Sequence, residues 1–243
     1  MTKRSPFRYV KTSPEIIRLA VMLYVRFPLS LRNVEDILHE RGIDISHETV
    51  RFWRNRFGPL FAAEIRRKRV QQLRAHSNWQ WHLDEVFVKI NGEIHYLWRA
   101  VDHEGEVLEC YVSKRRDRKA ALKFLRKSMK RHGNPAVIVT DKLRSYSAAM
   151  KQIGNSGRQE TGRWLNNRAE NSHLPFRRRE RAMLRFRQMR CLQKFVSAHS
   201  SVHNHFNQER HLYSRDNSSS TEAPLSPSGA SFVPDRFTYS VEN

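Results

Sequence analysis

The sequence predicts an α/β protein with a mixed sheet, whose elements run in the order β-β-β-α-β-α, preceded by a small all-α domain. Residues 79–113 carry runs of β-branched and aromatic residues divided by the turn signals Asn91-Gly92 and Glu104-Gly105. Residues 135–140 form a continuous apolar run, as expected of a strand that is buried on both faces. Upstream, apolar residues recur at the spacing of amphipathic helices.

Composition limits the classes of function. The chain has 243 residues, with 45 Lys+Arg against 24 Asp+Glu, a formal net charge of +21 and a pI near 10.8. Such an excess favours a polyanionic partner, because neutralised phosphates release counterions. No apolar run approaches the ~18 residues of a membrane-spanning helix, so nucleic acid is favoured over a membrane. Cys110 and Cys191 lie far apart, which argues against a disulfide scaffold and a structural zinc site and fits a reducing cytoplasm.

Three short helices are predicted in the N-terminal part of the chain. The first begins at Ser13-Pro14, with Ser as the N-cap and Pro at the first helical position. The second is capped by Ser30 and stops at Gly42, and the third opens at Ser46. An apolar stripe on the third helix is made of Val50, Trp53 and Phe57.

The third helix also has a polar face, formed by His47, Arg51, Arg54 and Asn55. Three short helices with a glycine-containing turn before a basic third helix are typical of a helix-turn-helix module, in which the third helix enters the DNA major groove. A small helical bundle with an ordinary solvated face would give the same pattern. The turn, the polarity of the third helix and the net charge together favour DNA binding by these four side chains.

The hydrophobic period changes to that of strands at residue 79. An antiparallel meander of three strands is followed by a helix, a buried strand and a returning helix. The predicted ranges are 79–90, 94–101, 107–112, 119–132, 135–140 and 145–153. This order in a mixed sheet is that of the ribonuclease H-like fold.

These elements divide the chain into three parts. We expect a helix-turn-helix domain over residues 1–75, in which residues 64–74 form a basic linker. A ribonuclease H-like domain follows over residues 76–213. The Ser-, Pro- and Asn-rich residues 214–243 are expected to be a disordered tail.

Asp84 is the first candidate for chemistry. On a strand it shares a face with Val86, Val88 and Ile90, where a carboxylate is unfavourable unless something compensates it. Either an arginine partner or a metal ion would do so. Its neighbour Glu85 faces the other way and is expected to form a salt bridge.

Asp141 is the second candidate. It follows the buried strand 135–140, whose carboxyl end faces the crevice where α/β sheets bind ligands. Asp141 alternatively caps the next helix, although residues 142–144 intervene, and capping is compatible with metal ligation. His199 and His203 have the i, i+4 spacing of a metal-binding pair, but the long amphipathic helix around them favours a packed face.

A third carboxylate, Glu170, follows the pair Asn166-Asn167 and precedes Arg177 by seven residues. With the helix-turn-helix pattern and the two aspartates, this motif makes the chain resemble the bacterial insertion-sequence transposases of the Asp-Asp-Glu type, which have an integrase-like catalytic core. It is most similar to the compact insertion-sequence-six family, from about residue 8 to residue 213.

One feature departs from the family pattern. Asp141 and Glu170 enclose twenty-eight residues, a shorter interval than in many members. The shortening falls around residues 154–157, where a surface loop can be trimmed without moving the sheet. Glu160 is the substitute for the third carboxylate, but it lacks the Asn-Asn context.

The resemblance implies a DNA transposase that binds the terminal inverted repeats of an insertion sequence. It would use Asp84, Asp141 and Glu170 to hold two Mg²⁺ ions, for which Mn²⁺ can substitute, and would cleave a 3′ end and transfer that strand into target DNA. Further DNA contacts are expected from Asn166, Asn167, Arg177 and Arg178, although the asparagines can instead fix the start of their segment.

The partners implied are double-stranded DNA, as element repeats and target, and a homodimer or larger assembly, without a membrane. A cytoplasmic, nucleoid-associated location in a bacterium is expected. Two other classes of function remain open: a catalytically impaired remnant or DNA-binding regulator of the same fold, and a structure-selective nuclease. The sequence gives neither the repeats nor the target preference.

Overall fold

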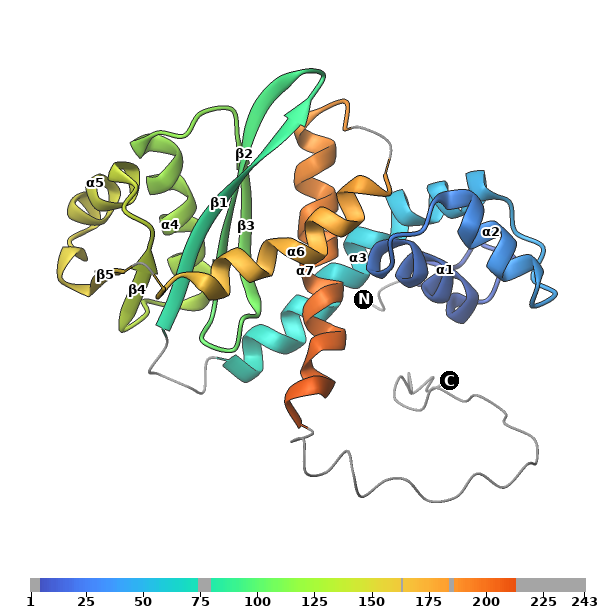
Figure 1. Cartoon of the computed structure of the whole chain (residues 1–243). Helices are drawn as coiled ribbons and strands as arrows, with labels where there is room; N and C mark the ends of the chain where they lie inside the picture. Colours follow the sequence, from blue (N-terminus) through green and yellow to red (C-terminus); the bar gives the residue numbers. More distant parts are fainter. Residues whose placement is uncertain (1–4, 74–79, 163, 184–185, 213–243) are drawn as a thin grey trace. The chain divides into compact units, whose positions relative to one another are not determined.

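The computed structural model describes residues 5–73, 80–162, 164–183 and 186–212. Residues up to Gln208 gather into one compact unit. Within this unit, three N-terminal helices precede a five-stranded sheet, and helices pack on both faces of that sheet (Figure 1). In the described part of the chain, no helix has the length and apolar character needed to cross a membrane.

The N-terminal helices follow the prediction, with bounds α1 (Pro14–Arg26), α2 (Leu31–His39) and α3 (His47–Leu73). Helix α1 begins where the Ser13 hydroxyl accepts a hydrogen bond from the Ile16 amide at 3.4 Å. Helix α2 begins at a reciprocal capping box between Ser30 and Asn33. The turn after α2 contains Gly42 at φ +70°, a left-handed conformation that favours glycine.

Helix α3 is longer than the sequence suggested. The basic residues 64–74 were expected to form a linker, but the described residues up to Leu73 are helical. Helix α3 continues past Pro59 with a packed side, since Ala62 is buried and Ile65 lies against the hydrophobic core; the role of residues 64–74 as a linker stays a prediction. Tertiary packing therefore extends a helix that has no wide apolar face of its own.

The sheet has the strand order β3-β2-β1-β4-β5. Strands β1, β2 and β3 are antiparallel neighbours, whereas β4 is parallel to β1 and to β5. The strand bounds are β1 (Gln80–Ile90), β2 (Glu93–Val101), β3 (Val107–Ser113), β4 (Val137–Thr140) and β5 (Gln159–Thr161). This topology is the ribonuclease H-like fold that the sequence predicted.

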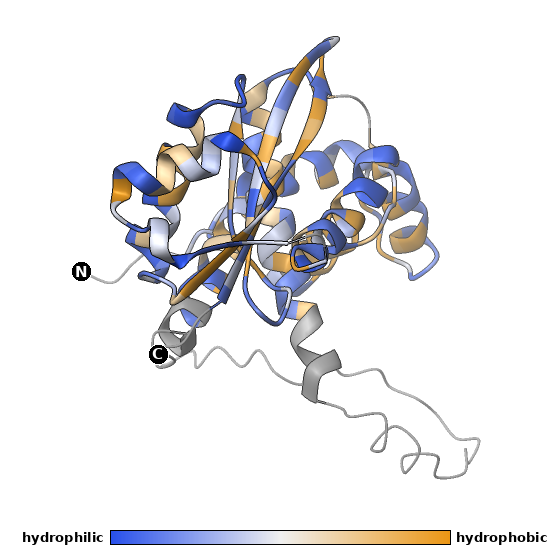
Figure 2. Cartoon of the chain, turned by 60° about the vertical axis from the view of Figure 1, so that its left-hand side comes forward, coloured by the Kyte–Doolittle hydropathy of each residue, from blue (hydrophilic) through white to orange (hydrophobic). Residues whose placement is uncertain are grey.

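Helices cover both faces of the sheet, with bounds α4 (Arg118–His132), α5 (Arg144–Ile153), α6 (Asn167–Arg181) and α7 (Met189–Leu212). On β1, Trp81 and Leu83 pack in one cluster with α4 and α5, whereas Val88 and Ile90 pack in another with α6 and α7. Figure 2 shows hydrophobic stretches along the strands and many hydrophilic residues along the helices. Because successive side chains of a strand point to opposite faces of the sheet, neighbouring residues of β1 contact different helices.

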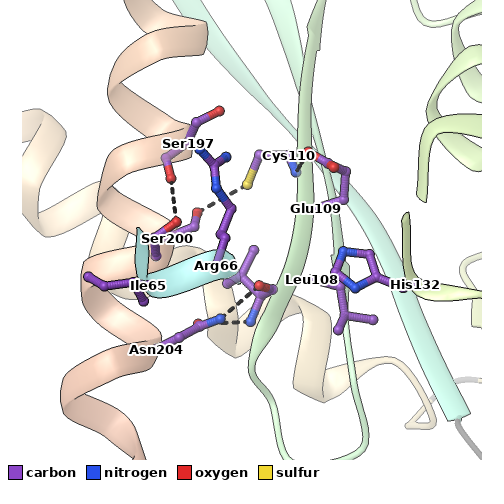
Figure 3. Close-up of a pocket in the computed structure, with 11 residues that line it drawn as sticks. Ile65, Arg66, Leu108, Glu109, Cys110, His132, Ser197, Ser200 and Asn204 are labelled. Atoms are coloured by element: carbon purple, nitrogen blue, oxygen red, sulfur yellow. Dashed lines mark hydrogen bonds between the residues drawn. The ribbon is translucent and has the colours of Figure 1, made fainter. Parts of the chain in front are cut away.

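Helix α7 covers the edge strand β3. The Asn204 side chain accepts a hydrogen bond from the Val107 amide (3.0 Å) and donates one to the Val107 carbonyl (2.8 Å). The Gln193 side chain accepts from the Val112 amide (2.8 Å) and donates to the Cys110 carbonyl (3.1 Å). Figure 3 shows Asn204 facing β3 in the small pocket between these elements. The side chains of α7 in this pocket therefore satisfy backbone groups at the outer edge of the sheet, which prevents that edge from pairing with another strand.

A buried arginine joins α6 to the N-terminal helices. Arg179 is 1% exposed, donates from Nε to the Tyr24 carbonyl at 2.7 Å and lies over the Tyr24 ring at 4.1 Å. The Tyr24 hydroxyl in turn accepts a hydrogen bond from Arg54 of α3 at 3.3 Å.

The predicted domain boundary falls in residues 74–79, and the predicted tail in residues 213–243; both lie outside the described residues and stay predictions.

Candidate active site

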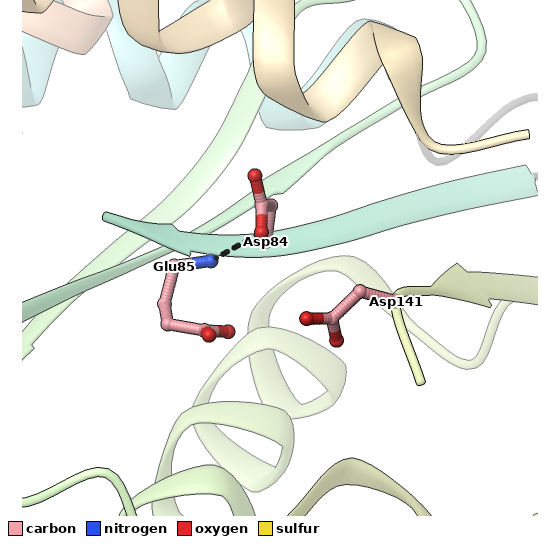
Figure 4. Close-up of side chains that lie close together, drawn as sticks. All are labelled: Asp84, Glu85 and Asp141. Carbon is pink, nitrogen blue, oxygen red and sulfur yellow. Dashed lines mark hydrogen bonds between the residues drawn. The ribbon is translucent and has the colours of Figure 1, made fainter. Parts of the chain in front are cut away.

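Three carboxylates gather where β1 and β4 run side by side. The parallel register pairs Leu83 with Thr140, so the residues that follow them, Asp84 and Asp141, come next to each other. Asp84, Glu85 and Asp141 each offer an oxygen, and these oxygens lie within 4.8 Å of one another (Figure 4). The sequence predicted the two aspartates of this cluster but not the participation of Glu85.

Both oxygens of Asp84 are held. Oδ1 accepts a hydrogen bond from the Glu85 amide at 2.9 Å, and Oδ2 lies 3.1 Å from Nε2 of His173 on α6. Burial lowers the pKa of His173, while the hydrogen bond to Asp84 opposes this shift. A neutral imidazole that donates from Nε2 satisfies this geometry. The sequence analysis missed His173, whose only local signal is its position three residues after Glu170.

Buried polar contacts fasten α6 to the sheet beside Asp84. Arg99, opposite Asp84 on β2, is 1% exposed and donates to the Ser172 carbonyl at 2.6 Å. Asn166 is 5% exposed and donates from Nδ2 to the Leu83 carbonyl at 2.8 Å. Of the two roles predicted for Asn166, the structure shows the one that fixes the start of its segment. Its amide is buried against β1, and the predicted DNA contact of Asn166 stays a prediction.

Glu85 points to the opposite side of β1 from Asp84, as expected. Its side chain is 3% exposed and forms the predicted salt bridge, to Arg116, at 2.5 Å. Burial, followed by the charge of Asp141, raises the pKa of Glu85 to about 7, although Arg116 opposes the shift. Its Oε2 atom has no hydrogen-bond partner among the described residues. Glu85 is therefore a buried carboxylate near Asp141, and the buried Tyr146 hydroxyl also interacts with it and opposes the rise of its pKa.

Asp141 is more open, with 38% of its side chain exposed. Oδ1 accepts a hydrogen bond from the Leu143 amide at 3.1 Å, and Oδ2 lies 3.6 Å from Arg116. Burial raises the pKa of Asp141 and the charge of Asp84 adds to this, whereas the Leu143 amide and Arg116 lower it. Helix α5 begins at Arg144 without a side-chain cap, so Asp141 is not its N-cap.

Glu170 lies outside this cluster. It is exposed in the first turn of α6 and belongs to none of the described groups of metal-competent side chains. Its possible substitute Glu160 is exposed on the edge strand β5 and is also outside them. Helix α6 runs without a break through Pro175. Glu170 therefore stays a prediction as third ligand.

Some of the α3 side chains predicted to contact DNA are engaged in contacts within the protein, whereas others are exposed. His47 pairs with Glu35 at 2.9 Å, and Arg54 donates to Tyr24 and to Asn55. The exposed members are Arg51, which pairs with Glu48 on the surface, and Asn55.

On α6, Asn167 and Arg178 are exposed. Arg177 donates to the Phe87 carbonyl and to Glu180, at 2.6 Å each. These contacts hold Arg177 against the β1 strand, so its role at DNA stays a prediction.

The histidine pair of α7 is packed. His199 is 3% exposed, and its ring stacks on that of His203 with centroids 6.2 Å apart. Phe176 and Phe195 lie against the His199 ring. Neither histidine belongs to the described metal-competent groups, so the packed face favoured by the sequence is the one observed.

A ribonuclease H-like sheet, with one carboxylate within β1 and another directly after the adjacent strand β4, defines the class of DDE enzymes, which cleave and join DNA strands. A family model described as "DDE domain" matches residues 78–209. The chain belongs to this family: it is a DDE transposase of the bacterial insertion-sequence-six type. Divalent metal dependence follows from membership of the family.

Similar proteins come from bacteria and an archaeon. The transposase for the insertion sequence-like element IS431mec of Staphylococcus aureus is 32% identical over 172 residues, which cover 69% of this chain and 75% of that protein. The Staphylococcus aureus transposase for the insertion sequence element IS257 in transposon Tn4003 is 31% identical over 172 residues, again 69% of this chain and 75% of that protein. An uncharacterised protein of Methanocaldococcus jannaschii is 30% identical over 155 residues, or 63% of this chain and 67% of its own length.

One solved structure is a weaker match. A chain of the simian T-cell lymphotropic virus intasome, in complex with the PP2A regulatory subunit B56 gamma, is 16% identical and has a TM-score of 0.38, over 66% of this chain and 62% of its own. Because that score is low, the fold assignment rests on the strand order and register.

Proposed function

We propose that this transposase binds the terminal inverted repeats of its element, cleaves a strand to leave a 3′-OH and transfers that end into target DNA. The observation that carries the proposal is the approach of Asp84, within β1, and Asp141, just after β4, at the point where the pairing of these two parallel strands ends. Each carboxylate is held by hydrogen bonds from neighbouring groups, and their oxygens lie a few ångströms apart. A divalent metal site in a phosphodiester-cleaving enzyme requires this arrangement.

The donor set fits Mg²⁺, or Mn²⁺ in its place. These ions prefer carboxylate oxygens and keep several waters, and the cluster offers three such oxygens within 4.8 Å of one another. Asp84 and Asp141 would hold the metal, with Glu170 as the proposed third ligand. A pair of such ions supplies charge neutralisation at the scissile phosphate and an activated oxygen nucleophile.

The chain's own groups orient these ligands. The Glu85 amide and His173 fix Asp84, and the Leu143 amide fixes Asp141. Hydrogen bonds to ligating carboxylates restrict their rotation, so they favour one geometry of the site before DNA arrives.

The DNA would be bound by the N-terminal helices and by basic tracts around the site. The formal net charge of +21 supports a polyanionic partner, and the exposed Arg51 and Asn55 on α3 are available for the major groove. We propose that residues 1–75 read the repeats and residues 76–213 carry the chemistry. Since two element ends must meet, a homodimer or larger assembly is proposed, in the bacterial cytoplasm at the nucleoid.

The test is strand transfer with oligonucleotides that carry the terminal repeats, in Mg²⁺. We expect Asp84→Asn and Asp141→Asn each to reduce transfer at least about a thousandfold, because each removes a ligand charge. Glu170→Gln should do the same, whereas Glu160→Gln, a matched change on an exposed edge strand, should retain activity. Transfer that survives in the two aspartate variants would refute the metal assignment.

A catalytically impaired remnant is the second candidate, since the Glu170 carboxylate lies outside the cluster. This candidate predicts binding to the repeats without any nicking. A structure-selective nuclease would instead nick DNA without preference for the repeats. The same assay, run beside a gel-shift titration, separates the three outcomes.

A further inference from the structure

Arg116 lies beside the carboxylate cluster, in the loop between β3 and α4. Its Nη2 atom is 2.5 Å from Oε1 of Glu85 and 3.6 Å from Oδ2 of Asp141. One guanidinium nitrogen is thus shared between two carboxylates. The short contact is to the buried carboxylate, and the long contact is to the one proposed as a metal ligand.

The two carboxylates that contact Arg116 differ in their exposure to solvent. Glu85 is 3% exposed and cannot turn to solvent, whereas the Asp141 side chain is 38% exposed. Arg116 itself is 41% exposed, and the Ser145 hydroxyl donates to its backbone carbonyl at 3.4 Å. The guanidinium can therefore move away from Asp141 while its backbone and its contact with Glu85 stay in place.

The charges explain why such a cation is needed. Three carboxylates whose oxygens lie within 4.8 Å repel one another in a partly desolvated place. A divalent ion on Asp84 and Asp141 would relieve this repulsion, but it would also repel a guanidinium next to Asp141. Glu85 remains available to Arg116 in both situations.

We propose that Arg116 is a tethered counter-ion of the carboxylate site: it neutralises Asp141 in the metal-free enzyme, yields that carboxylate to the metal, and is retained beside the site by Glu85. Glu85 is then a positioning residue that acts through Arg116. This inference rests on the proposed function, since it presupposes that Asp84 and Asp141 bind the metal. The retained guanidinium would keep donors of the kind that bind phosphate oxygens next to the carboxylates.

The experiment measures binding of Mn²⁺ alone to the full chain without DNA, by the loss of the free-ion EPR signal. Arg116→Gln should bind Mn²⁺ about three- to tenfold more tightly, because the competing cation is gone. Glu85→Gln should bind it about three- to tenfold more weakly, because Arg116 keeps only Asp141 as its partner. The double variant should behave like Arg116→Gln within about twofold, since the effect of Glu85 passes through Arg116.

Two controls accompany the cycle. Arg115→Gln changes the same net charge one residue away and should leave Mn²⁺ affinity within about twofold of the starting protein. Arg116→Lys retains a cation and should also stay close to it. Circular dichroism of each variant checks the fold.

The outcomes separate the inference from the function on which it rests. If Asp84→Asn and Asp141→Asn bind Mn²⁺ as the unchanged chain does, the proposed metal site is wrong. If they lose binding but Arg116→Gln gains no affinity, the counter-ion is wrong and the metal site stands. If Glu85→Gln weakens binding equally with and without Arg116, Glu85 acts on the metal directly and the tether is wrong.

Discussion

At the scale of single residues, His173 connects the helix that carries Glu170 to the carboxylate on β1. Its ring is buried, and its only hydrogen-bond partner among the described residues is Asp84. The bond restricts rotation of the Asp84 carboxylate. A group that holds a ligand in this way affects metal affinity and rate without touching the substrate.

We therefore expect His173→Ala to lower strand transfer about 10–100-fold and to weaken Mn²⁺ binding. His173→Gln should recover most of both, because the glutamine amide can donate from the position of the imidazole Nε2. Leu174→Ala, a change at the next and exposed residue of α6, is the control. Equal defects in the Ala and Gln variants would contradict the positioning role and indicate lost packing alone.

At the scale of elements, helix α3 carries the residues proposed to read DNA. Arg51 and Asn55 lie one turn apart and are exposed, whereas Arg54 is tied to Tyr24. A side chain that reads a base edge contributes to discrimination between sequences, while one that contacts phosphate contributes equally to all DNA.

The double change Arg51→Ala with Asn55→Ala should weaken binding to the terminal repeats about 10–100-fold in a gel-shift titration. Binding to unrelated DNA should fall much less. Arg32→Ala, on the exposed side of α2, removes one positive charge elsewhere in the same domain and should spare the preference for the repeats. An unchanged ratio of specific to non-specific affinity in the double variant would exclude α3 as the reading helix.

The sequence predicted the strands and short helices well, because their signals are local. Alternation along β1 placed Asp84 and Glu85 on opposite faces, and the apolar run of β4 placed Asp141 at its end. The length of helix α3 was not predicted, because residues 64–74 are mostly basic and the packing of Ile65 against the core depends on residues far away in the sequence.

Contacts between distant parts of the chain were not predictable in the same way. His173 meets Asp84 across 89 positions of sequence, and Asn166 meets Leu83 across 83. No periodicity encodes such pairs. Arg116 was one of many basic residues near the site, and only the fold shows which one pairs with Glu85.

At the scale of the whole molecule, stability depends on groups that are kept neutral in the core. Burial lowers the pKa of His199 well below its usual range, and the nearby cations Arg99 and Arg179 act in the same direction, as does His203. The unfolded chain therefore binds a proton more readily than the folded one. This histidine leaves stability unaffected above about pH 6.5 and reduces it as the pH falls below that value.

His199→Phe should thus flatten the pH dependence of the free energy of unfolding between about pH 6.5 and pH 5. The difference in slope should approach about 1.4 kcal/mol per pH unit, the effect of one proton. Urea unfolding at several pH values measures it. His39→Gln, at an exposed position on α2, should keep the original slope, and a variant His199→Phe that keeps it too would contradict the assignment.

The buried bond between Arg179 and the Tyr24 carbonyl ties helix α6 to the N-terminal helices. Helix α6 carries Glu170 and His173 in its first half and Arg179 near its other end, and Tyr24 in turn contacts helix α3 through Arg54. A helix rises 1.5 Å per residue, so Glu170 and Arg179 stand roughly 13 Å apart along its axis. If α3 binds the terminal repeats and Glu170 the metal, as proposed, then α6 fixes the spacing between these two sites, and the cut would fall at a constant distance from the bases that α3 contacts.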